Sequence, residues 1–241
     1  MASHFFTGRQ LQLRGDSDQA RRDWTHVADA VGVPGERLWR MRQVHGCDVF
    51  RVNDGTPATP PQVDAIVTDR DDVALAVQVA DCVPLLLADP RTGAVAATHA
   101  GWRGTAANVA AATVAQLVRE YGVRPADLIA AIGPSIGPAR FQVGPDVREA
   151  FDASPSLQPG RWFAPDTGDR LRFDIWRANH DQLVAAGLDP AHVHVAGLCT
   201  VTHVEHFFSY RREQQSTGRL LGVIRSRGPN GRTSAASERQ E

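Results

Sequence analysis

The chain contains 241 residues, of which 42% are hydrophobic and 22% charged, so it is long enough for one sizeable core. Its formal net charge is -1, which argues against broad electrostatic binding of nucleic acid or of an anionic membrane. All 26 basic residues are arginine, which excludes lysine Schiff-base catalysis and a Walker A phosphate loop, so we expect a small-molecule substrate.

Cysteine content and apolar pattern bear on the cellular compartment. Cys47, Cys82 and Cys199 form no close pair and leave one thiol over, which does not suit the disulfide framework of a secreted protein. The first residues lack the apolar run of a signal peptide, and no 18-residue apolar stretch occurs. We therefore expect a cytoplasmic protein with no membrane association.

The first half of the chain is rich in short apolar runs. Clusters of β-branched and apolar residues predict four buried strands, at 65–67, 73–79, 83–88 and 94–98. A turn containing Pro90 and Gly93 separates the last two, which favours antiparallel pairing. An alanine-rich stretch with helical spacing follows from Thr105 to about Tyr121 and ends at Gly122.

The second half alternates between strand and helix patterns. The sequence predicts a strand at 128–132, a helix at 145–151, a surface loop at 154–170, a helix at 173–186, a strand at 192–196 and a strand at 220–224. We expect a single catalytic domain over residues 1–225 and a disordered polar tail over residues 226–241. The alternation predicts an α/β fold with mixed sheets.

Three side chains that can bind a metal stand out. His45 precedes a glycine, Cys82 joins two predicted strands, and His99 ends another, where sites cluster in α/β folds. Two imidazoles and one thiolate form a three-ligand zinc set, which leaves one position for water or substrate. Their separations are not those of a zinc finger, so their convergence depends on the fold.

Three other interpretations compete for these residues. A cysteine hydrolase would use Cys82 as nucleophile and His99 as base, with Asp81 or Asn108 as the orienting group. A copper oxidase with several metal centres needs many histidines, and the nine present include one His-x-His pair, at 192 and 194. A binding module without catalysis is the third alternative.

Two further groups are candidates for substrate binding. Gln43 and His45 would share one face if their segment were a strand. Arg211 and Arg212 follow aromatic residues, an arrangement that suits an anion or a nucleobase. The glycine-rich segment 133–137 lacks the spacing of a dinucleotide-binding loop and more simply indicates a tight turn.

Several strings together resemble the YfiH-type family, also known as the laccase-domain or multicopper polyphenol oxidoreductase family, as peptidoglycan editing factor and as purine nucleoside phosphorylase. They occur in the family's order: Gln-Val-His-Gly at 43–46, Asp-Ala at 64–65, Ala-Asp-Cys-Val-Pro at 80–84, His-Ala-Gly-Trp-Arg-Gly at 99–104 and Phe-Ser-Tyr-Arg-Arg at 208–212. The resemblance covers roughly residues 40–225 and implies a YfiH-like domain of layered mixed β-sheets flanked by helices.

The resemblance also implies a site and an activity. It places one zinc ion on His45, Cys82 and His99, with copper less suited to this histidine inventory. The implied reaction is phosphorolysis of adenosine, inosine, guanosine and S-methyl-5′-thioadenosine, with some deamination of adenosine. Arg103, like the paired arginines, would bind substrate phosphate, and Asp81 would orient a histidine or move a proton.

The chain departs from the family pattern in two places. Its N-terminal segment after Arg9 is shorter than the usual loop. Phe141 and Gln142 replace a Tyr-Glu pair, so a hydroxyl and a carboxylate are missing. Base preference or rate could differ if either group contacts the substrate.

Overall fold

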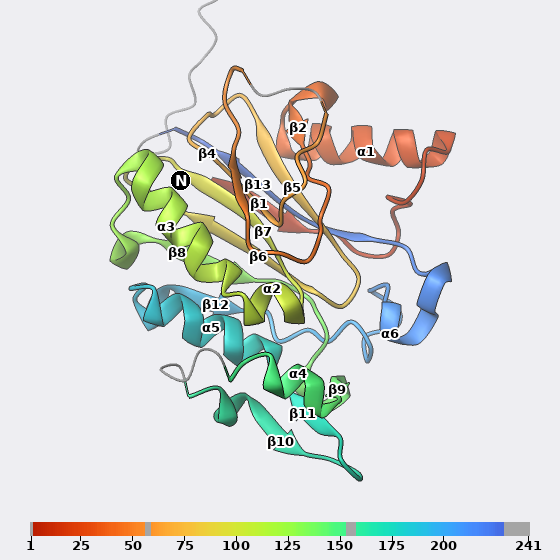
Figure 1. The fold of residues 1–241 in the computed structure, drawn as a ribbon. Coiled ribbons are helices and arrows are strands. Elements are labelled where there is room, and N and C mark those ends of the chain that lie inside the picture. The colour runs from red at the N-terminus through yellow and green to blue at the C-terminus, as the bar shows by residue number, and fades with distance from the viewer. Residues whose placement is uncertain (1, 56–58, 153–157, 229–241) are drawn as a thin grey trace, which may run out of the picture.

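The protein is built as four layers, with two mixed β-sheets packed face to face between helices (Figure 1). The structure is a computed structural model that describes residues 2–55, 59–152 and 158–228. Helix α1 (Asp18–Val31) covers one sheet, and helices α3 (Val109–Tyr121) and α5 (Ile175–Ala185) cover the other. The predicted α/β fold of layered mixed sheets flanked by helices is confirmed.

The four-stranded sheet has the order β1-β13-β5-β2. Its strands are β1 (Ala2–Phe6), β13 (Leu220–Ser226), β5 (Ala74–Val79) and β2 (Leu38–Trp39). Side chains alternate along β5, so Ala74 and Ala76 pack against α1 while Leu75 and Val77 face the second sheet. Both faces of this strand are therefore buried.

The six-stranded sheet has the order β12-β8-β6-β7-β4-β3. Its strands are β12 (Val193–Val195), β8 (Ile129–Ile132), β6 (Val83–Ala88), β7 (Val95–Ala100), β4 (Ala65–Thr68) and β3 (Val49–Arg51). Leu85 and Leu87 pack in the core below α3 and α5, and Leu86 packs in the core between the sheets. The predicted antiparallel hairpin between β6 and β7 is confirmed.

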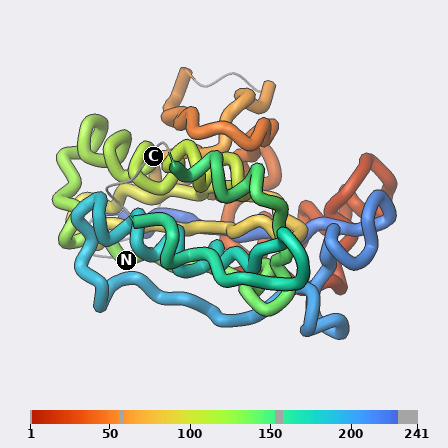
Figure 2. The backbone as a smooth tube through the Cα atoms, turned by 60° about the horizontal axis from the view of Figure 1, so that its bottom comes forward, coloured from red at the N-terminus to blue at the C-terminus, as the bar shows by residue number. Residues whose placement is uncertain are grey.

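The N-terminal and C-terminal parts of the chain lie side by side, as the red and blue segments at the right of Figure 2 show, and their strands are paired. Strand β1 pairs antiparallel with β13, from Ala2 opposite Ser226 to Phe6 opposite Gly222. The final strand thus runs two residues beyond its predicted end, and the tail predicted from residue 226 begins inside a strand. Residues 229–241 of that tail lie outside the described residues.

A third, small sheet corrects the predicted surface loop at 154–170. It contains β10 (Phe163–Pro165), β11 (Leu171–Phe173) and β9 (Gln142–Val143), in the order β10-β11-β9. Trp162 is 1% exposed, and its Nε1–H donates to Asp181 of α5 over 2.8 Å. This segment is packed against the domain, although its sequence shows no clear period.

The predicted helices differ from the observed ones mainly at their ends. The stretch from Thr105 to Tyr121 is broken into α2 (Trp102–Ala106) and α3, because Asn108 adopts a left-handed conformation and caps α3 through its side chain. Helix α5 begins at Ile175, since Asp174 caps it. Two short helices remain, α4 (Pro145–Glu149) and α6 (Tyr210–Glu213). Among the described residues, no helix has the length and apolarity needed to cross a bilayer.

We expect Trp162→Phe to lower the free energy of unfolding by about 1–3 kcal/mol, because the buried Asp181 carboxylate loses a hydrogen-bond donor. Urea denaturation would measure the change. Trp24→Phe is the matched control. The half-buried Trp24 has a guanidinium over its ring, and the ring of phenylalanine keeps this contact. Equal stability of the wild-type and Trp162→Phe proteins would contradict this role.

Candidate metal centre

The three predicted metal ligands lie together. The ligand atoms of His45, Cys82 and His99 are all within 4.8 Å of one another, the one such group among the described residues. His45 comes from the loop before β3, Cys82 from the crossing between β5 and β6, and His99 from β7. His99 is 3% exposed, whereas His45 is open to solvent.

Strand pairing explains how residues distant in sequence converge. Because β6 and β7 pair antiparallel with Pro84 opposite His99, Cys82 falls at the same sheet edge as His99. Strand β4 pairs with the other side of β7, and the His99 N–H donates to the Asp64 carbonyl over 2.7 Å. Strand β3 pairs with β4, which brings the preceding His45 loop to this edge.

A buried carboxylate connects the two histidines. Asp64 is 0% exposed, and its Oδ1 lies 2.7 Å from Nδ1 of His99. A proton on Nδ1 donated to this carboxylate leaves Nε2 as the ligand nitrogen. Although Asp64 lies within a string typical of the family, sequence reasoning did not assign it to the site.

The same carboxylate fixes the loop that carries His45. The amides of Val44, His45 and Gly46 donate to Asp64 over 3.1, 2.9 and 2.7 Å. His45 has φ of 62°, a left-handed conformation that is unfavourable for a residue with a β-carbon. These three hydrogen bonds hold the loop in that conformation.

The glycines after His99 allow the ligands to approach the helix that follows. A β-carbon at Gly101 would lie 3.1 Å from Sγ of Cys82 and 3.1 Å from Cδ2 of His45. A β-carbon at Gly104 would lie 2.9 Å from the carbonyl oxygen of Gly46. The Gly-Trp-Arg-Gly string is therefore explained by close packing of α2 against two ligands and the His45 loop.

The electrostatics of the group favour a thiolate. Burial by itself raises the pKa of the Cys82 thiol, but the charge of His99 and hydrogen bonds from both histidines lower it to about 6. Burial lowers the pKa of His99, but Cys82 and Asp64 together raise it to about 9. Two imidazoles and a thiolate that converge in this way fit a metal ion that prefers nitrogen and sulfur ligands.

Two clefts meet at His45 and Cys82, and His99 lines the second of them. The first has a volume of about 460 Å³, and the second of about 590 Å³. They share four lining residues: His45, Ala80, Cys82 and Tyr210. The first has mainly apolar and aromatic walls, including Trp102, Ile136, Phe141, Val143 and Ile175, while polar side chains of the second include Arg42, Gln43, Gln78 and Arg219.

Residues 8–227 match the sequence profile of a family described as multi-copper polyphenol oxidoreductase laccase. The chain belongs to this family.

Relatives named purine nucleoside phosphorylase match most of the chain. It is 33% identical to a purine nucleoside phosphorylase of Bacteroides thetaiotaomicron, over 92% of this chain and 90% of the relative. It is 36% identical to a purine nucleoside phosphorylase of Deinococcus radiodurans, over 91% and 82%. The corresponding values for purine nucleoside phosphorylase YfiH of Escherichia coli are 34%, 87% and 82%.

Solved structures show the same fold. A Bacillus licheniformis protein named YfiH superimposes with a TM-score of 0.88 and 28% identity, covering 93% of this chain and 92% of that chain. YlmD of Geobacillus stearothermophilus has a TM-score of 0.84 and 30% identity, with the same coverage. Both agree with the layered domain described above.

Two of the three arginines predicted to bind substrate line the first cleft. The guanidinium of Arg103 lies 4.1 Å from the ring centroid of Trp102. The guanidinium of Arg211 lies 5.5 Å from the ring centroid of Phe141 and donates to the Gln142 carbonyl over 3.0 Å. The departures from the family pattern at 141 and 142 therefore fall on the wall of this cleft.

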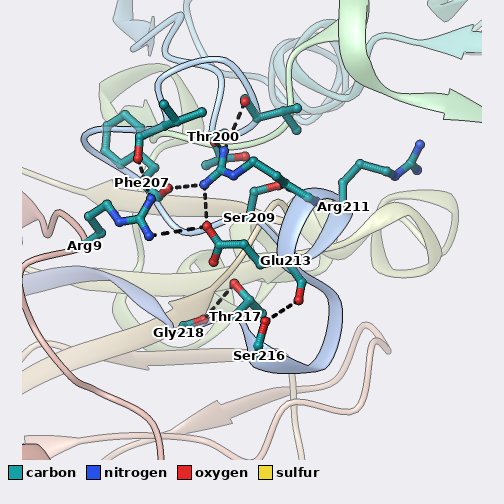
Figure 3. Close-up of polar contacts among 12 residues, drawn as sticks. Arg9, Thr200, Phe207, Ser209, Arg211, Glu213, Ser216, Thr217 and Gly218 are labelled. Carbon is teal, nitrogen blue, oxygen red and sulfur yellow. Dashed lines mark hydrogen bonds and ion pairs between the residues drawn. The ribbon is translucent and has the colours of Figure 1, made fainter.

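The third, Arg212, has contacts of another kind, with residues that include Thr200, Phe207 and Glu213, which are labelled in Figure 3. Its guanidinium donates to the carbonyls of Thr200 and Phe207 over 2.9 and 2.8 Å. It also lies 2.6 Å from the Glu213 carboxylate, which pairs with Arg9 over 3.5 Å. Arg212 thus joins the segment before α6 to the N-terminal segment and does not line either cleft.

The side chains of Asp81 and Gln43 line the clefts but already have hydrogen-bond partners within the protein. Asp81 accepts from the hydroxyl of Thr200 and from the amide of Arg211, both over 2.6 Å. Gln43 exchanges two hydrogen bonds with the backbone of Gln78, over 2.7 and 2.9 Å. The carboxylate that contacts a histidine ligand is therefore that of Asp64, and not that of Asp81. The side chain of Gln43 joins its own segment to β5.

We expect Asp64→Asn to weaken the binding of added Zn²⁺, the probe ion, about 10- to 100-fold, because one oxygen that accepts the His99 and loop hydrogen bonds becomes an amide nitrogen. Competition with a chromogenic chelator would measure the dissociation constant. Asp48→Asn, an exposed change in the same loop, is the control. Unchanged zinc affinity in the Asp64 variant would contradict this role.

We also expect zinc affinity to rise with pH. Between about pH 6 and pH 9 the metal-free site holds a Cys82 thiolate and a protonated His99, which must lose its proton to bind the ion. One released proton corresponds to about a tenfold gain in affinity per pH unit, with the gain ending above pH 9. Chelator competition across this range would test it, and a flat profile would contradict it.

Proposed function

We propose that the protein is a zinc-dependent purine nucleoside phosphorylase acting on adenosine, inosine, guanosine and S-methyl-5′-thioadenosine, with some adenosine deaminase activity. The observation that carries this proposal is the convergence of His45, Cys82 and His99 at the junction of two clefts. Relatives named purine nucleoside phosphorylase support the choice of substrate class. The co-substrate would be inorganic phosphate.

The choice of zinc rests on the ligand set and its surroundings. Catalytic zinc is held by three protein ligands drawn from histidine, cysteine and carboxylate, with a fourth position open, and two histidines and a cysteine meet this requirement. A single copper can use the same donors, but multicopper chemistry needs further histidine-rich centres. The described residues contain one candidate group, so the family description as a multi-copper oxidoreductase has less support than zinc.

The first cleft suits the nucleoside. Its volume lies in the range of small-molecule pockets, and its walls carry the aromatic rings of Trp102 and Phe141 for contact with a purine. Arg103 and Arg211 supply N–H donors for ring or ribose acceptors. The ribose C1′ would then lie near the shared lining residues, between the two clefts.

Each part of the site has a distinct task in this reaction. A bound zinc ion supplies Lewis acidity where the clefts meet. Asp64 fixes the orientation of His99 and the His45 loop, and Asp81 fixes the segment that carries Arg211. The apolar wall excludes water from C1′, which favours transfer to phosphate over hydrolysis.

A cysteine hydrolase is the second candidate, because His99 lowers the pKa of the Cys82 thiol and Asp64 contacts His99. Such an enzyme would act on an amide or a peptidoglycan precursor without metal. In this alternative Asp64 would be the orienting group. The two candidates assign different roles to the same thiol.

We expect purified protein to carry about one zinc ion and to release free base from inosine or adenosine only with phosphate present. Cys82→Ser should lose most of the metal and at least about 100-fold in kcat/KM, since one of three ligands is removed. Metal analysis and chromatographic detection of base and ribose phosphate would measure both. Ammonia release from adenosine would report the deaminase activity.

The hydrolase alternative predicts activity without metal. A fully active metal-free protein, with its Cys82 thiol trapped by an alkylating substrate analogue, would contradict the zinc phosphorylase. Cys47→Ser is the matched control, because Cys47 is a partly exposed thiol outside the ligand group.

A further inference from the structure

The second cleft differs from the first in the chemistry of its walls. Outside the candidate ligands, its charged side chains are the guanidinium groups of Arg42 and Arg219, and its lining also includes the polar Gln43 and Gln78. No carboxylate belongs to its lining, and the cleft reaches His99 and Cys82 at one end. It therefore offers positive charge directly beside the candidate metal centre.

Strand register places the two arginines on opposite sides of the chain that leads to Cys82. Arg219 immediately precedes β13, whose first residue Leu220 pairs with Val79 of β5. Arg42 follows β2 on the other side of β5 and precedes Gln43, which is joined to the Gln78 backbone by two hydrogen bonds. The guanidinium groups thus flank the end of β5.

Neither guanidinium forms an ion pair with a carboxylate within the part of the chain that the structure describes, and Arg42 is exposed to solvent. No carboxylate among these residues lies within ion-pair distance of Arg42 or Arg219. Arg219 is half-buried, and its one side-chain hydrogen bond is to the Gly218 carbonyl over 3.0 Å. Burial and the neighbouring Arg14 lower the pKa of Arg219, and the Cys82 thiolate and Tyr210 offset part of this effect.

A half-buried guanidinium whose N–H donors mostly lack acceptors is unfavourable unless a ligand with acceptor atoms binds to it. Four of the five N–H groups of Arg219 have no hydrogen bond to the described protein. Arg212 provides the contrast, because its donors bind backbone carbonyls and Glu213. Donor groups directed to a cleft and free of protein acceptors indicate a ligand that accepts hydrogen bonds.

We propose that the second cleft is the phosphate subsite, in which inorganic phosphate binds between Arg42 and Arg219. The planar guanidinium groups match the tetrahedral anion through paired N–H donors, and the chain has no lysine that could do so. This inference rests on the proposed phosphorolysis and assigns its two substrates to separate clefts.

The arrangement accounts for the reaction geometry. With the nucleoside in the first cleft and phosphate in the second, C1′ lies between base and phosphate. A phosphate oxygen forms a bond to C1′ while the bond from C1′ to the purine nitrogen breaks, and its electron pair leaves with the base, which takes up a proton. The products are ribose 1-phosphate and free purine.

The first cleft is the competing location for phosphate, since Arg103, Arg170 and Arg211 line it, but Asp81 and Asp146 line it too. The guanidinium groups of Arg103 and Arg211 lie over aromatic rings, and Arg211 also donates to a backbone carbonyl. We therefore expect them to affect nucleoside binding more than phosphate binding.

Steady-state kinetics with both substrates varied would test the assignment. We expect Arg219→Gln, and separately Arg42→Gln, to raise the KM for phosphate about 10- to 100-fold and that for inosine less than about threefold. Arg103→Gln should show the opposite pattern. Arg22→Gln, an exposed change on α1, is the matched control and should alter neither constant.

Phosphate binding without turnover separates this proposal from the proposed function. Calorimetric titration of zinc-loaded protein with inorganic phosphate should detect binding that Arg219→Gln and Arg42→Gln weaken, with zinc content and melting temperature unchanged. Arg219→Lys keeps the charge and should recover part of the affinity that Arg219→Gln loses. It serves as the test variant if Arg219→Gln folds poorly. This result would support the subsite even in a protein that released no base.

Two outcomes would overturn the subsite. One is an active enzyme in which the Arg42 and Arg219 variants both keep the wild-type KM for phosphate. This result would contradict the subsite but not the proposed phosphorolysis. The other is a phosphate KM that rises in Arg103→Gln and not in Arg219→Gln, which would move the anion to the first cleft.

Discussion

The site depends on the hydrogen bonds of one buried carboxylate, that of Asp64. It binds Nδ1 of His99 and three successive amides of the His45 loop, so it sets the position of two of the three candidate ligands. A buried carboxylate with so many donors resists displacement, because any movement would leave charge and amides without partners. The strained backbone at His45 is held in this way.

The crossing of the chain from one sheet to the other creates the second feature of the site. Strand β5 ends in the four-stranded sheet, and β6 begins in the six-stranded sheet, with Asp81 and Cys82 between them. Asp81 has φ of 86° and holds the crossing through bonds to Thr200 and the backbone of α6. Cys82 therefore lies where both sheets end, with a cleft on either side, an arrangement suited to a reaction between two small molecules.

Long apolar patterns were sufficient to predict the central strands and the helices above them, whereas short or polar elements were not. Strand β10 has three residues, too few to show alternation, and it is stabilised by contacts of Phe163 with Phe151 and Phe173. Helix α1 shows no strong apolar pattern, because it is largely polar and buries small residues. Its caps, Ser17 and Gly32, are nevertheless recognisable signals in the sequence. The break at Asn108 depends on a left-handed residue that an alanine-rich pattern conceals.

The sequence alone determined which residues could form a metal site, because His45, Cys82 and His99 are the right chemical types in recognisable strings. The tertiary structure decided which polar side chains surround it. Arg212, from a string shared with the family, is occupied by backbone carbonyls, while Arg219, outside that string, faces the second cleft. The reason is physical: local pattern determines which side of an element is buried, but the partners of a side chain depend on pairing between strands that lie far apart in sequence.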